Sequence, residues 1–400
     1  MTLRLRSRPD WGLLAMKSEW KTVPLSEAAD LTVGFVGTMA SHYVDDGVLF
    51  LRSTNIEPFN IRMDDVKFIS EDFNNKIKKS QLNENDVVIV RTGKPGACAV
   101  IPRKSEAWNC SDLVIIHPDQ SALDPVFLAS YINLASGVIN AHLVGAVQQH
   151  FNVSVAKKMM IPLPPINEQR KIASLIRSLN SKIETNRKIN DNLSEMLQSI
   201  YQQRFNISNN SEEYGVLADI CDYSKDRISV SSLSVSDYYS TENMLPGKAG
   251  AVAASSLPSI AQTTKCKTGD VLISNIRPYF RKIVYCQSDC GCSTDVLCFT
   301  PKSSALSAYL FSTLYADRFF DFMVAGSKGT KMPRGDKQQI MTYAIHIPTD
   351  GELDDFNELA KPLLAQIESN RLECISLSAL RDGLLPKLMS GEIDVSDIQL

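Results

Sequence analysis

The sequence lacks the features of a membrane-spanning or secreted protein. It contains no run of 18 or more apolar residues, which a transmembrane helix would require. Its first segment, MTLRLRSRPDWGLLAMKSEW, is basic but has no apolar stretch of the kind found in secretory signals. The nine cysteines are an odd number scattered over 400 residues, so we expect reduced thiols and a cytoplasmic location.

The sequence also lacks the common catalytic motifs. None of the patterns GxGxxG, GxxxxGK[ST], HExxH and GxSxG occurs, and the five histidines form no ligand-spaced pair. The stretch LPPI at 163–166 has the two prolines of an adenine methyltransferase motif, but it lacks the polar residue and the aromatic ring that such a site needs. The cysteines at 286–298 form no CxxC pair, so we expect buried thiols there and not a zinc site.

One catalytic arrangement fits the sequence literally. Asp10, Glu19 and Lys21 supply the two acids and the lysine that a nuclease of the PD…ExK type places around Mg²⁺. The gap between the acids is short for the paired strands of such a site, and the region is typical of a charged terminal segment. A self-contained nuclease using these three residues stays an alternative.

The chain contains an internal repeat with a period of about 184 residues. Four blocks recur in the same order. They are LNENDVVIV (82–90) with CKTGDVLIS (266–274), SDLVIIHP (111–118) with TDVLCFTP (294–301), IPLPP (161–165) with IHIPTD (345–350), and SKIETNRKI (181–189) with AQIESNRLE (365–373). This agreement predicts a tandem duplication in which each copy is an α/β globule followed by a helix.

Each copy is predicted to end in a long helix with a heptad pattern, because apolar residues recur at alternating spacings of four and three. The first helix is expected from about 167 to 204, with Asn167 as its N-cap after Pro164 and Pro165. For the second we expect a break at Leu385–Pro386 and an end at Gly391. The predicted seam residues are Ile172, Ile176, Leu179, Ile183, Asn186 and Leu193 in the first helix and Ile367, Asn370, Leu377 and Leu384 in the second.

The two helices are predicted to pair with each other. Asn186 and Asn370 occupy matched seam positions, and a buried asparagine fixes the register because sliding would leave its amide unpaired. Duplicated copies related by a pseudo-two-fold axis would make the pairing antiparallel. We therefore predict a mixed α/β fold of two similar globular domains (1–165 and 211–350) separated by an antiparallel two-helix coiled-coil spacer (166–210 and 351–400).

Basic residues and glycines collect at matching places in the two copies, and such loops are typical of nucleic-acid contacts. Each cluster alone is also compatible with a solvated loop. The net charge of −3 does not exclude DNA binding, since a local basic face is sufficient. The candidate DNA-binding residues are Arg91, Gly93, Lys94, Arg103, Gln148, Gln149 and Asn152 in the first copy and Arg277, Tyr279, Arg281, Lys282, Lys328, Lys331, Arg334 and Lys337 in the second.

These patterns resemble the specificity (S) subunits of type I restriction–modification systems. The likeness spans nearly the whole chain and rests on four stretches: IPLPPINEQRKIASLI (161–176) with the helix after it, DVVIVRTGKPG (86–96), GTKMPRGDKQQI (329–340) and SGEIDV (390–395). One departure is that the second helix starts with IPTDGELDDF and has no PPxxEQ pattern, which makes its onset less well defined.

The resemblance implies two target-recognition domains, each recognising one half of a bipartite DNA target. It also implies that the paired helices dock two methyltransferase (M) subunits and that restriction and motor (R) subunits join the complex. S-adenosylmethionine, Mg²⁺, ATP and catalysis would then belong to the partners, with no cofactor, metal or catalytic residue in this chain.

A second alternative is a coiled-coil scaffold whose globules bind protein. It predicts no salt-dependent DNA affinity, whereas a DNA-binding subunit should lose affinity steeply as salt rises. In the DNA-binding interpretation, helices of about 50 Å would hold the two recognised segments about one DNA turn, or ~34–36 Å, apart.

Overall fold

The computed structural model describes residues 20–63, 65–93, 95–144, 151–205 and 214–398. Its contacts divide the chain into a first unit, Met1–Lys182 with Leu377–Leu400, and a second unit, Ile183–Ser376. Each unit combines β-sheets and helices of its own with part of each of two long helices, α4 (Ile166–Phe205) and α9 (Asp350–Ser390). Within the described residues, none of the helices is both long and apolar enough to cross a membrane.

The first unit contains an antiparallel sheet in the order β10-β9-β12-β2 and a mixed sheet in the order β3-β7-β4-β11-β8. Two further pairs, β1-β13 and β5-β6, are antiparallel ribbons. The strands are β1 (Lys21–Pro24), β2 (Ala29–Val33), β3 (Tyr43–Val44), β4 (Val48–Leu51), β5 (Ile56–Glu57), β6 (Asn60–Ile61), β7 (Lys67–Ile69), β8 (Gln81–Leu82), β9 (Val87–Val90), β10 (Cys98–Val100), β11 (Trp108–Cys110), β12 (Leu113–Pro118) and β13 (Met160–Leu163), and the helices are α1 (Glu71–Lys76), α2 (Pro125–Val144) and α3 (Val153–Lys157).

The second unit contains an antiparallel sheet in the order β15-β22-β19-β20, a mixed sheet in the order β16-β18-β21-β17 and the ribbon β14-β23. Its strands are β14 (Tyr214–Val216), β15 (Cys221–Tyr223), β16 (Arg227–Ser229), β17 (Tyr238–Tyr239), β18 (Gln262–Cys266), β19 (Val271–Ser274), β20 (Ile283–Tyr285), β21 (Cys290–Cys292), β22 (Val296–Pro301) and β23 (Ala344–His346), and its helices are α5 (Leu217–Ile220), α6 (Ser307–Tyr315), α7 (Asp317–Ala325) and α8 (Lys337–Met341).

The predicted repeat is confirmed, because the two units share one strand topology. Strands β2, β12, β9 and β10 have the same order in their sheet as β15, β22, β19 and β20 in theirs. The second sheets also correspond, since β4 pairs in parallel with β11 as β17 does with β21. The predicted mixed α/β fold with two sheet-rich domains and two long helices is thus confirmed.

Strands β9 and β19 form because their sequences, VVIV and VLIS, are apolar on both faces. Successive side chains of a strand point to opposite faces. Accordingly, Val87 and Ile89 pack into one hydrophobic core of the first unit, whereas Val88 and Val90 pack into another. A strand covered on both sides is a near-continuous apolar run and not an alternating one, and this is what makes the two repeat blocks recognisable.

A buried aspartate shapes the turn before each of these strands. The carboxylate of Asp86 accepts a hydrogen bond from the backbone N–H of Asn83 (2.6 Å), and that of Asp270 accepts one from Lys267 (2.8 Å). The hydrogen bond of Asp86 to the ring of His117 (2.6 Å) raises the pKa of that histidine. Burial raises the pKa of Asp270. The aspartates that align the repeat therefore have a structural role.

The start of α4 depends on Gln169, which is fully buried. Its amide donates to the carbonyls of Ala122 and Pro164 (2.8 Å each) and accepts from the N–H of Asp124 (2.9 Å). The prediction of Asn167 as N-cap is wrong, because the helix begins at Ile166 and the carbonyl of Pro165 accepts from Glu168 and Gln169. The glutamine of PPINEQ thus fixes the first turn of the helix to the globule.

The first turns of α9 are fixed by residues of a different kind from those of α4. Thr349 and Glu352 form a capping box, since the carboxylate of Glu352 accepts from the N–H of Thr349 (2.8 Å) and the Thr349 hydroxyl accepts from the N–H of Glu352 (3.3 Å). Asn357 then donates to the carbonyl of Ala305 (2.8 Å), the residue that matches Ala122 in the repeat. In α9 the capping box of TDGE (349–352) and the amide of Asn357, one turn further along the helix, therefore take the place of the missing PPxxEQ pattern.

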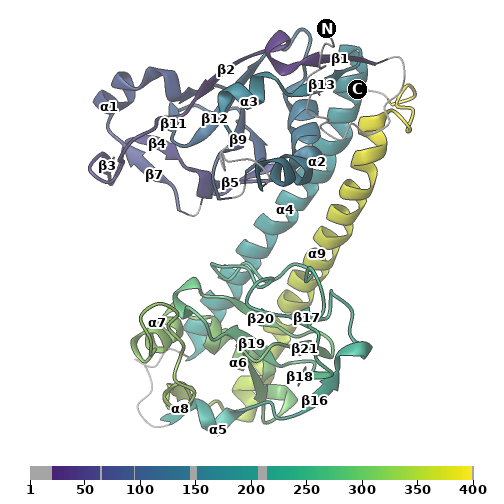
Figure 1. Cartoon of the computed structure of the whole chain (residues 1–400). Helices are drawn as coiled ribbons and strands as arrows, with labels where there is room; N and C mark the ends of the chain where they lie inside the picture. The colour runs from purple at the N-terminus through teal and green to yellow at the C-terminus, as the bar shows by residue number, and fades with distance from the viewer. Residues whose placement is uncertain (1–19, 64, 94, 145–150, 206–213, 399–400) are drawn as a thin grey trace. The chain divides into compact units, whose positions relative to one another are not determined.

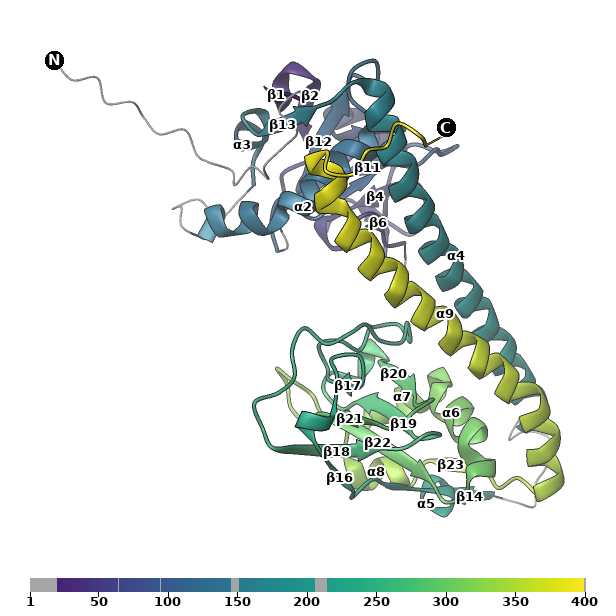
Figure 2. The same ribbon diagram turned by 90° about the vertical axis from the view of Figure 1, so that its right-hand side faces the viewer.

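The helices α4 and α9 lie side by side and antiparallel within each unit (Figures 1 and 2). In the second unit, Asn186 donates to Glu373 (2.7 Å), Asn190 to the carbonyl of Ile367 (2.9 Å) and Asn370 to Asn190 (2.8 Å). In the first unit, Arg381 donates to Asn180 (3.0 Å). Of the predicted seam residues, Ile172, Ile176, Ile183, Asn186 and Asn370 are buried, and Leu179, Leu193, Ile367, Leu377 and Leu384 are half-buried.

The predicted break at Leu385–Pro386 is wrong, because α9 continues to Ser390. A proline inside a helix removes one hydrogen bond and costs about 3 kcal/mol. Here Leu385, Leu388 and Met389 are buried in the core of the first unit, so their packing offsets this cost. The helix stops at Gly391, as predicted: its last residue is Ser390, and Gly391 follows with a positive φ of 74°.

The amide network of the helix pair leads to a stability prediction. Replacing Asn370 with Ala should lower the free energy of unfolding by about 1–3 kcal/mol, because the side chain of Asn190 loses its partner at a buried position. Urea unfolding of the full-length chain measures this change. Asn192→Ala, at an exposed position of α4, is the control and should change stability by less than about 0.5 kcal/mol; equal effects of the two substitutions would contradict the network's role.

Candidate nucleic-acid interface

In the first unit, the structure brings together two of the predicted basic segments. Arg91 directly follows β9, and Asn152 precedes α3. The backbone N–H of Phe151 donates to the carbonyl of Arg91 (3.3 Å), so the two segments are in contact. We call residues 91–93 and 95–97 after β9, together with residues 151–152 before α3, the first loop pair.

The second unit contains an equivalent second loop pair, formed by residues 275–282 after β19 and residues 326–336 before α8. The N–H of Gly335 donates to the carbonyl of Asn275 (3.3 Å), and the N–H of Arg277 donates to the carbonyl of Pro333 (2.7 Å). Gly335 and Asn275 lie 184 residues after Phe151 and Arg91, which the corresponding hydrogen bond joins in the first unit. The same backbone contact therefore joins the two predicted segments in each copy.

Each loop pair contacts an aspartate at the matched position of its unit. In the first unit Asp112 lies 3.4 Å from a guanidinium nitrogen of Arg91 and also accepts from the hydroxyl of Thr92. In the second unit Asp295 accepts from Arg334 (3.0 Å). The aspartates come from corresponding positions, but the arginines come from different halves of the loop pair. In both units an aspartate at the corresponding position thus holds an arginine in place, but the arginine comes from a different segment of the loop pair.

Several polar atoms in the loop pairs are buried and make no hydrogen bond among the described residues. They are Nε and Nη1 of Arg91, Nε of Arg277 and Oδ1 of Asn275, and Arg91 and Asn275 occupy matched positions in the repeat. The 3.4 Å ion pair of Arg91 is electrostatic only, since its geometry does not make a hydrogen bond. Buried polar groups usually have partners, so both loop pairs retain capacity for a further ligand.

The remaining candidates of the first copy differ in their roles. Asn152 caps α3 by accepting from the N–H of Val155 (3.0 Å), so its side chain is already used. Gly93 has a φ of 87°, which favours glycine, and it is exposed. Arg103 is exposed. Lys94, Gln148 and Gln149 lie outside the described residues.

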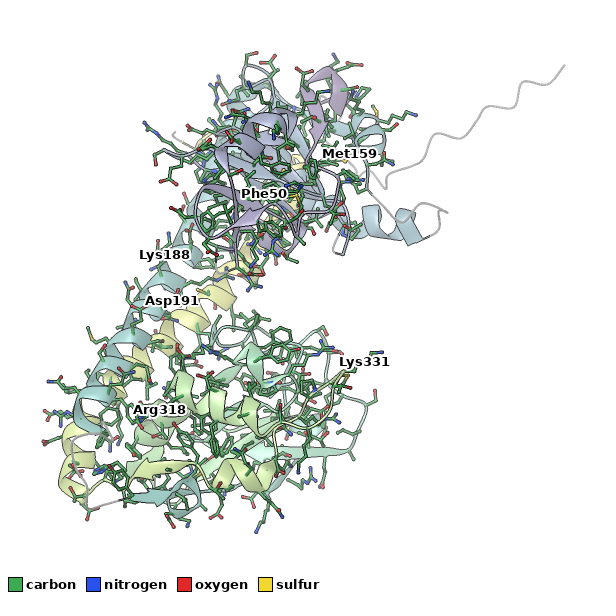
Figure 3. The ribbon with its side chains drawn as sticks, turned by 90° about the vertical axis from the view of Figure 1, so that its left-hand side faces the viewer. Phe50, Met159, Lys188, Asp191, Arg318 and Lys331 are labelled. Carbon is green, nitrogen blue, oxygen red and sulfur yellow. The ribbon has the colours of Figure 1, made fainter. Side chains whose placement is uncertain are left out.

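The candidates of the second copy form two groups. Lys328 is paired with Asp336 (2.5 Å) and Arg281 with Asp317 (2.8 Å), so acids in the same unit already compensate part of their charge. Lys331 and Lys337 are exposed. Figure 3 places Lys331 at the edge of the second unit, away from Asp191 of α4, with its side chain directed outward.

Two further candidates, Lys282 and Tyr279, lie in the first segment of the second loop pair. Burial lowers the pKa of Lys282, whose ammonium group donates to the carbonyl of Thr241 and lies 5.9 Å from the ring of Phe280. Tyr279, by contrast, is 50% exposed. Lys282 thus supports the loop from inside, whereas Tyr279 is presented to solvent.

The catalytic alternative stays untested by the described residues. Lys21 lies in β1 and is exposed, while Asp10 and Glu19 fall outside the described residues. The prediction of buried thiols is confirmed, because Cys286, Cys290, Cys292 and Cys298 are all buried in one hydrophobic cluster. Within the described ranges, no three metal-ligating side chains have an arrangement that could hold a metal ion.

A pocket of about 520 Å³ lies elsewhere in the second unit, between α4 and the start of α7. Its lining carries both signs of charge, from Lys248 and Arg318 and from Glu195 and Asp317. Lys248 and Asp317 pair at 2.5 Å, and this hydrogen bond lowers the pKa of Asp317. We therefore assign the candidate interface to the loop pairs and not to this pocket.

Sequence reasoning missed a pair of asparagines that organise the loops beside the mixed sheets. Asn55 and Asn243 are buried, and each accepts from a backbone N–H three residues earlier, at Arg52 and Ser240. Each also donates to a carbonyl further along, at Arg62 (3.2 Å) and Val252 (2.8 Å). The weak similarity of RSTN (52–55) and STEN (240–243) was the available signal.

A family model and several known proteins are similar to this chain. The family model described as "Type I restriction modification DNA specificity domain" matches residues 17–195. These residues, somewhat less than half of the chain, are therefore similar to this domain family. The resemblance of the chain to specificity subunits is confirmed.

Two relatives have similar sequences over part of their length. The type I restriction enzyme EcoBI specificity subunit of Escherichia coli is 24% identical over 140 residues, which are 34% of this chain and 29% of that protein. The MjaVIII specificity subunit of Methanocaldococcus jannaschii is 24% identical over 177 residues, 42% of this chain and 41% of that protein. The matched region therefore spans less than half the length of either relative.

A solved structure supports the fold over nearly the entire chain. The S subunit of a type I restriction–modification system from M. genitalium aligns with a TM-score of 0.52 and 16% identity, covering 97% of this chain and 99% of that one. At this level of identity the likeness shows a shared fold.

The contact between the two segments of the second loop pair can be tested at Gly335. A Cβ atom at this position would lie 2.7 Å from Cε of Met323, 2.9 Å from Cδ1 of Ile340 and 3.0 Å from Oδ1 of Asn275. Gly335→Ala should therefore lower the free energy of unfolding by about 1–3 kcal/mol through overpacking. Thermal unfolding measures the effect, and Gly351→Ala in α9, where a Cβ meets no atom within 4 Å, is the control that should not destabilise.

Proposed function

We propose that this chain is the non-catalytic DNA-specificity subunit of a type I restriction–modification complex, and that each unit binds one half of a bipartite duplex target. The observation that carries the proposal is the recurrence of the loop pair, with the same backbone contact and the same aspartate, in two units of one fold. The family model that matches residues 17–195 is described as a DNA specificity domain, which supports the same role.

The chemistry of the loop pairs suits a DNA duplex. Arginine and lysine contact phosphates and guanine edges, and an arginine held by a carboxylate reaches its target with less loss of side-chain freedom. A good bidentate contact discriminates between bases by about 1–3 kcal/mol. One loop pair can thus recognise only a short segment, and two different loop pairs specify a two-part target.

The helices α4 and α9 are proposed to dock the partner subunits. Ile189 and Met196 on α4 and Leu359 and Leu372 on α9 are large apolar residues with exposed side chains in the second unit. Exposed apolar groups of this kind are used for protein contacts. The partners would be two methyltransferase subunits and the restriction and motor subunits, which would carry S-adenosylmethionine, Mg²⁺ and ATP, and the complex would act on cytoplasmic DNA.

The independence of the two half-sites can be tested by domain exchange. Replacing residues 20–160 with the corresponding domain of another specificity subunit should change the bases of one half-site only, because each loop pair lies within one unit. Methylome sequencing of cells that express the exchanged chain with its methyltransferase measures the motif. A change in both halves would contradict separable recognition, and Mg²⁺-dependent DNA cleavage by the purified chain alone would contradict the non-catalytic role.

The length of the helices is proposed to set the number of unread base pairs between the half-sites. Deleting one heptad from each helix, residues 179–185 and 375–381, shortens both by about 10 Å and keeps the hydrogen bond between Asn186 and Glu373 in register. The unread gap should then shrink by about three base pairs, at 3.4 Å each. The same motif mapping measures it; an unchanged gap in an active complex would exclude the helices as a ruler. Deleting the residues from α4 alone is the control, and it should destabilise the chain because the register is lost.

A further inference from the structure

The turn at 277–281 in the second loop pair has an unusual backbone. Residues 278–280 form a single 3₁₀ turn, and the arginines on both sides of it, Arg277 and Arg281, have left-handed conformations with φ of 51°. Left-handed backbone is unfavourable for residues other than glycine, and such strain persists only where surrounding contacts impose it. The conformation of this turn is therefore held from outside.

The contacts that hold the turn come from both sides. The N–H groups of Gly247 and Lys248 donate to the carbonyls of Phe280 (2.8 Å) and Arg281 (2.9 Å). On the other side, the N–H of Arg277 donates to the carbonyl of Pro333 (2.7 Å). The guanidinium of Arg281 also binds Asp317 and Asp321. The backbone is thus fixed by three other segments of the second unit.

The rigid turn presents two aromatic side chains. Tyr279 is 50% exposed and Phe280 39% exposed, with ring centroids 4.8 Å apart and planes inclined by 56°. The buried Pro278 precedes them and fixes the start of the turn. Exposing two adjacent rings on a backbone fixed in an unfavourable conformation favours a binding role over a packing role.

The charge around the rings favours a polyanion over a protein partner. Basic residues surround the turn. Arg277, Arg281 and Lys282 lie in it or directly beside it, and Lys248 lies in a segment that is hydrogen-bonded to it. In the adjacent segment, the backbones of Lys328 and Arg334 pair in an antiparallel β-bridge. Ion pairs with Asp317, Asp321, Asp336 and Asp295 neutralise part of this charge at four of these residues, Lys248, Arg281, Lys328 and Arg334. The side chain of Arg277 keeps a buried Nε–H that makes no hydrogen bond among the described residues.

We propose that Tyr279 and Phe280 contact nucleobases, and not phosphates, in the half-site that the second unit recognises. This proposal rests on the proposed function. Aromatic rings contact bases through thymine methyl groups in the major groove or by insertion at a flexible base step. The matched positions of the first unit are Pro95 and Gly96, so the contact is specific to one half of the target.

The test uses the full-length chain and defined duplexes. Wild-type protein first selects 40-bp duplexes from a random-sequence library, and one selected duplex is compared with a scrambled duplex of the same composition. The double variant Tyr279→Ala/Phe280→Ala should bind the selected duplex about tenfold more weakly, and its affinity for the scrambled duplex should change less than about twofold. The slope of log affinity against log salt should stay the same, because apolar base contacts release no counterions.

Two further variants control for folding and for exposed apolar area. Tyr279→Leu/Phe280→Leu keeps apolar bulk without rings and should lose most of the same sequence preference. Ile260→Ala removes a 52% exposed side chain from the loop before β18 in the same unit and should leave binding to both duplexes unchanged. All three variants should unfold close to the temperature of the wild type, since each changed side chain is at least 39% exposed.

The outcomes separate this inference from the function on which it rests. If the wild-type chain selects no common sequence, the proposed function fails. If it does select one and the double variant binds it equally well, the aromatic contact is wrong. An equal loss for both duplexes with a shallower salt slope would assign the turn to phosphates and overturn the inference. Unchanged DNA binding with loss of the co-purifying methyltransferase subunit would make it a protein surface and would overturn it as well.

Discussion

The hydrophobic core of each unit is completed by helical residues from the other half of the sequence repeat. Leu385, Leu388 and Met389 of α9 pack in the core of the first unit, although they lie more than 200 residues from its strands β9 and β12. Tyr201 and Phe205 of α4 pack in the core of the second unit. Neither copy of the repeat can therefore bury its apolar surface alone, and the two long helices are part of both folds.

Because α4 and α9 each pack in the cores of both units, the first turn of each helix must be held at a fixed position. The amides of Gln169 and Asn357 bind the carbonyls of Ala122 and Ala305, which are matched positions of the repeat. A slip of either helix would break these hydrogen bonds, the buried amides at Asn186 and Asn370, and the core packing together. Each loop pair is consequently attached to a scaffold whose register has one solution, and rigid scaffolds position functional loops well.

The sequence was sufficient to predict the repeat, the mixed fold and the two antiparallel helices, because buried strands such as VVIV and heptad seams are local patterns. It was insufficient for features that depend on distant partners. Asn167 has the chemistry of an N-cap, yet Gln169 fixes the helix through the carbonyl of Ala122 and the backbone N–H of Asp124, which lie 47 and 45 residues earlier. Pro386 was expected to break α9, but core packing overrides local propensity there. The ion pairs of the loops and the strained turn at 277–281 likewise depend on contacts that no local pattern records.

The differences between the two loop pairs are as informative as their common frame. The strand order, the linking backbone hydrogen bond and the aspartate recur, so these elements support the site and cannot distinguish one target from another. What differs is the chemistry that the frame presents: glycine and Pro95 in the first unit against Tyr279 and Phe280 in the second. Specificity is a difference of affinities, so under the proposed function it would come from these variable groups. A duplicated scaffold with divergent loops is therefore suited to recognising two unlike segments with one fold.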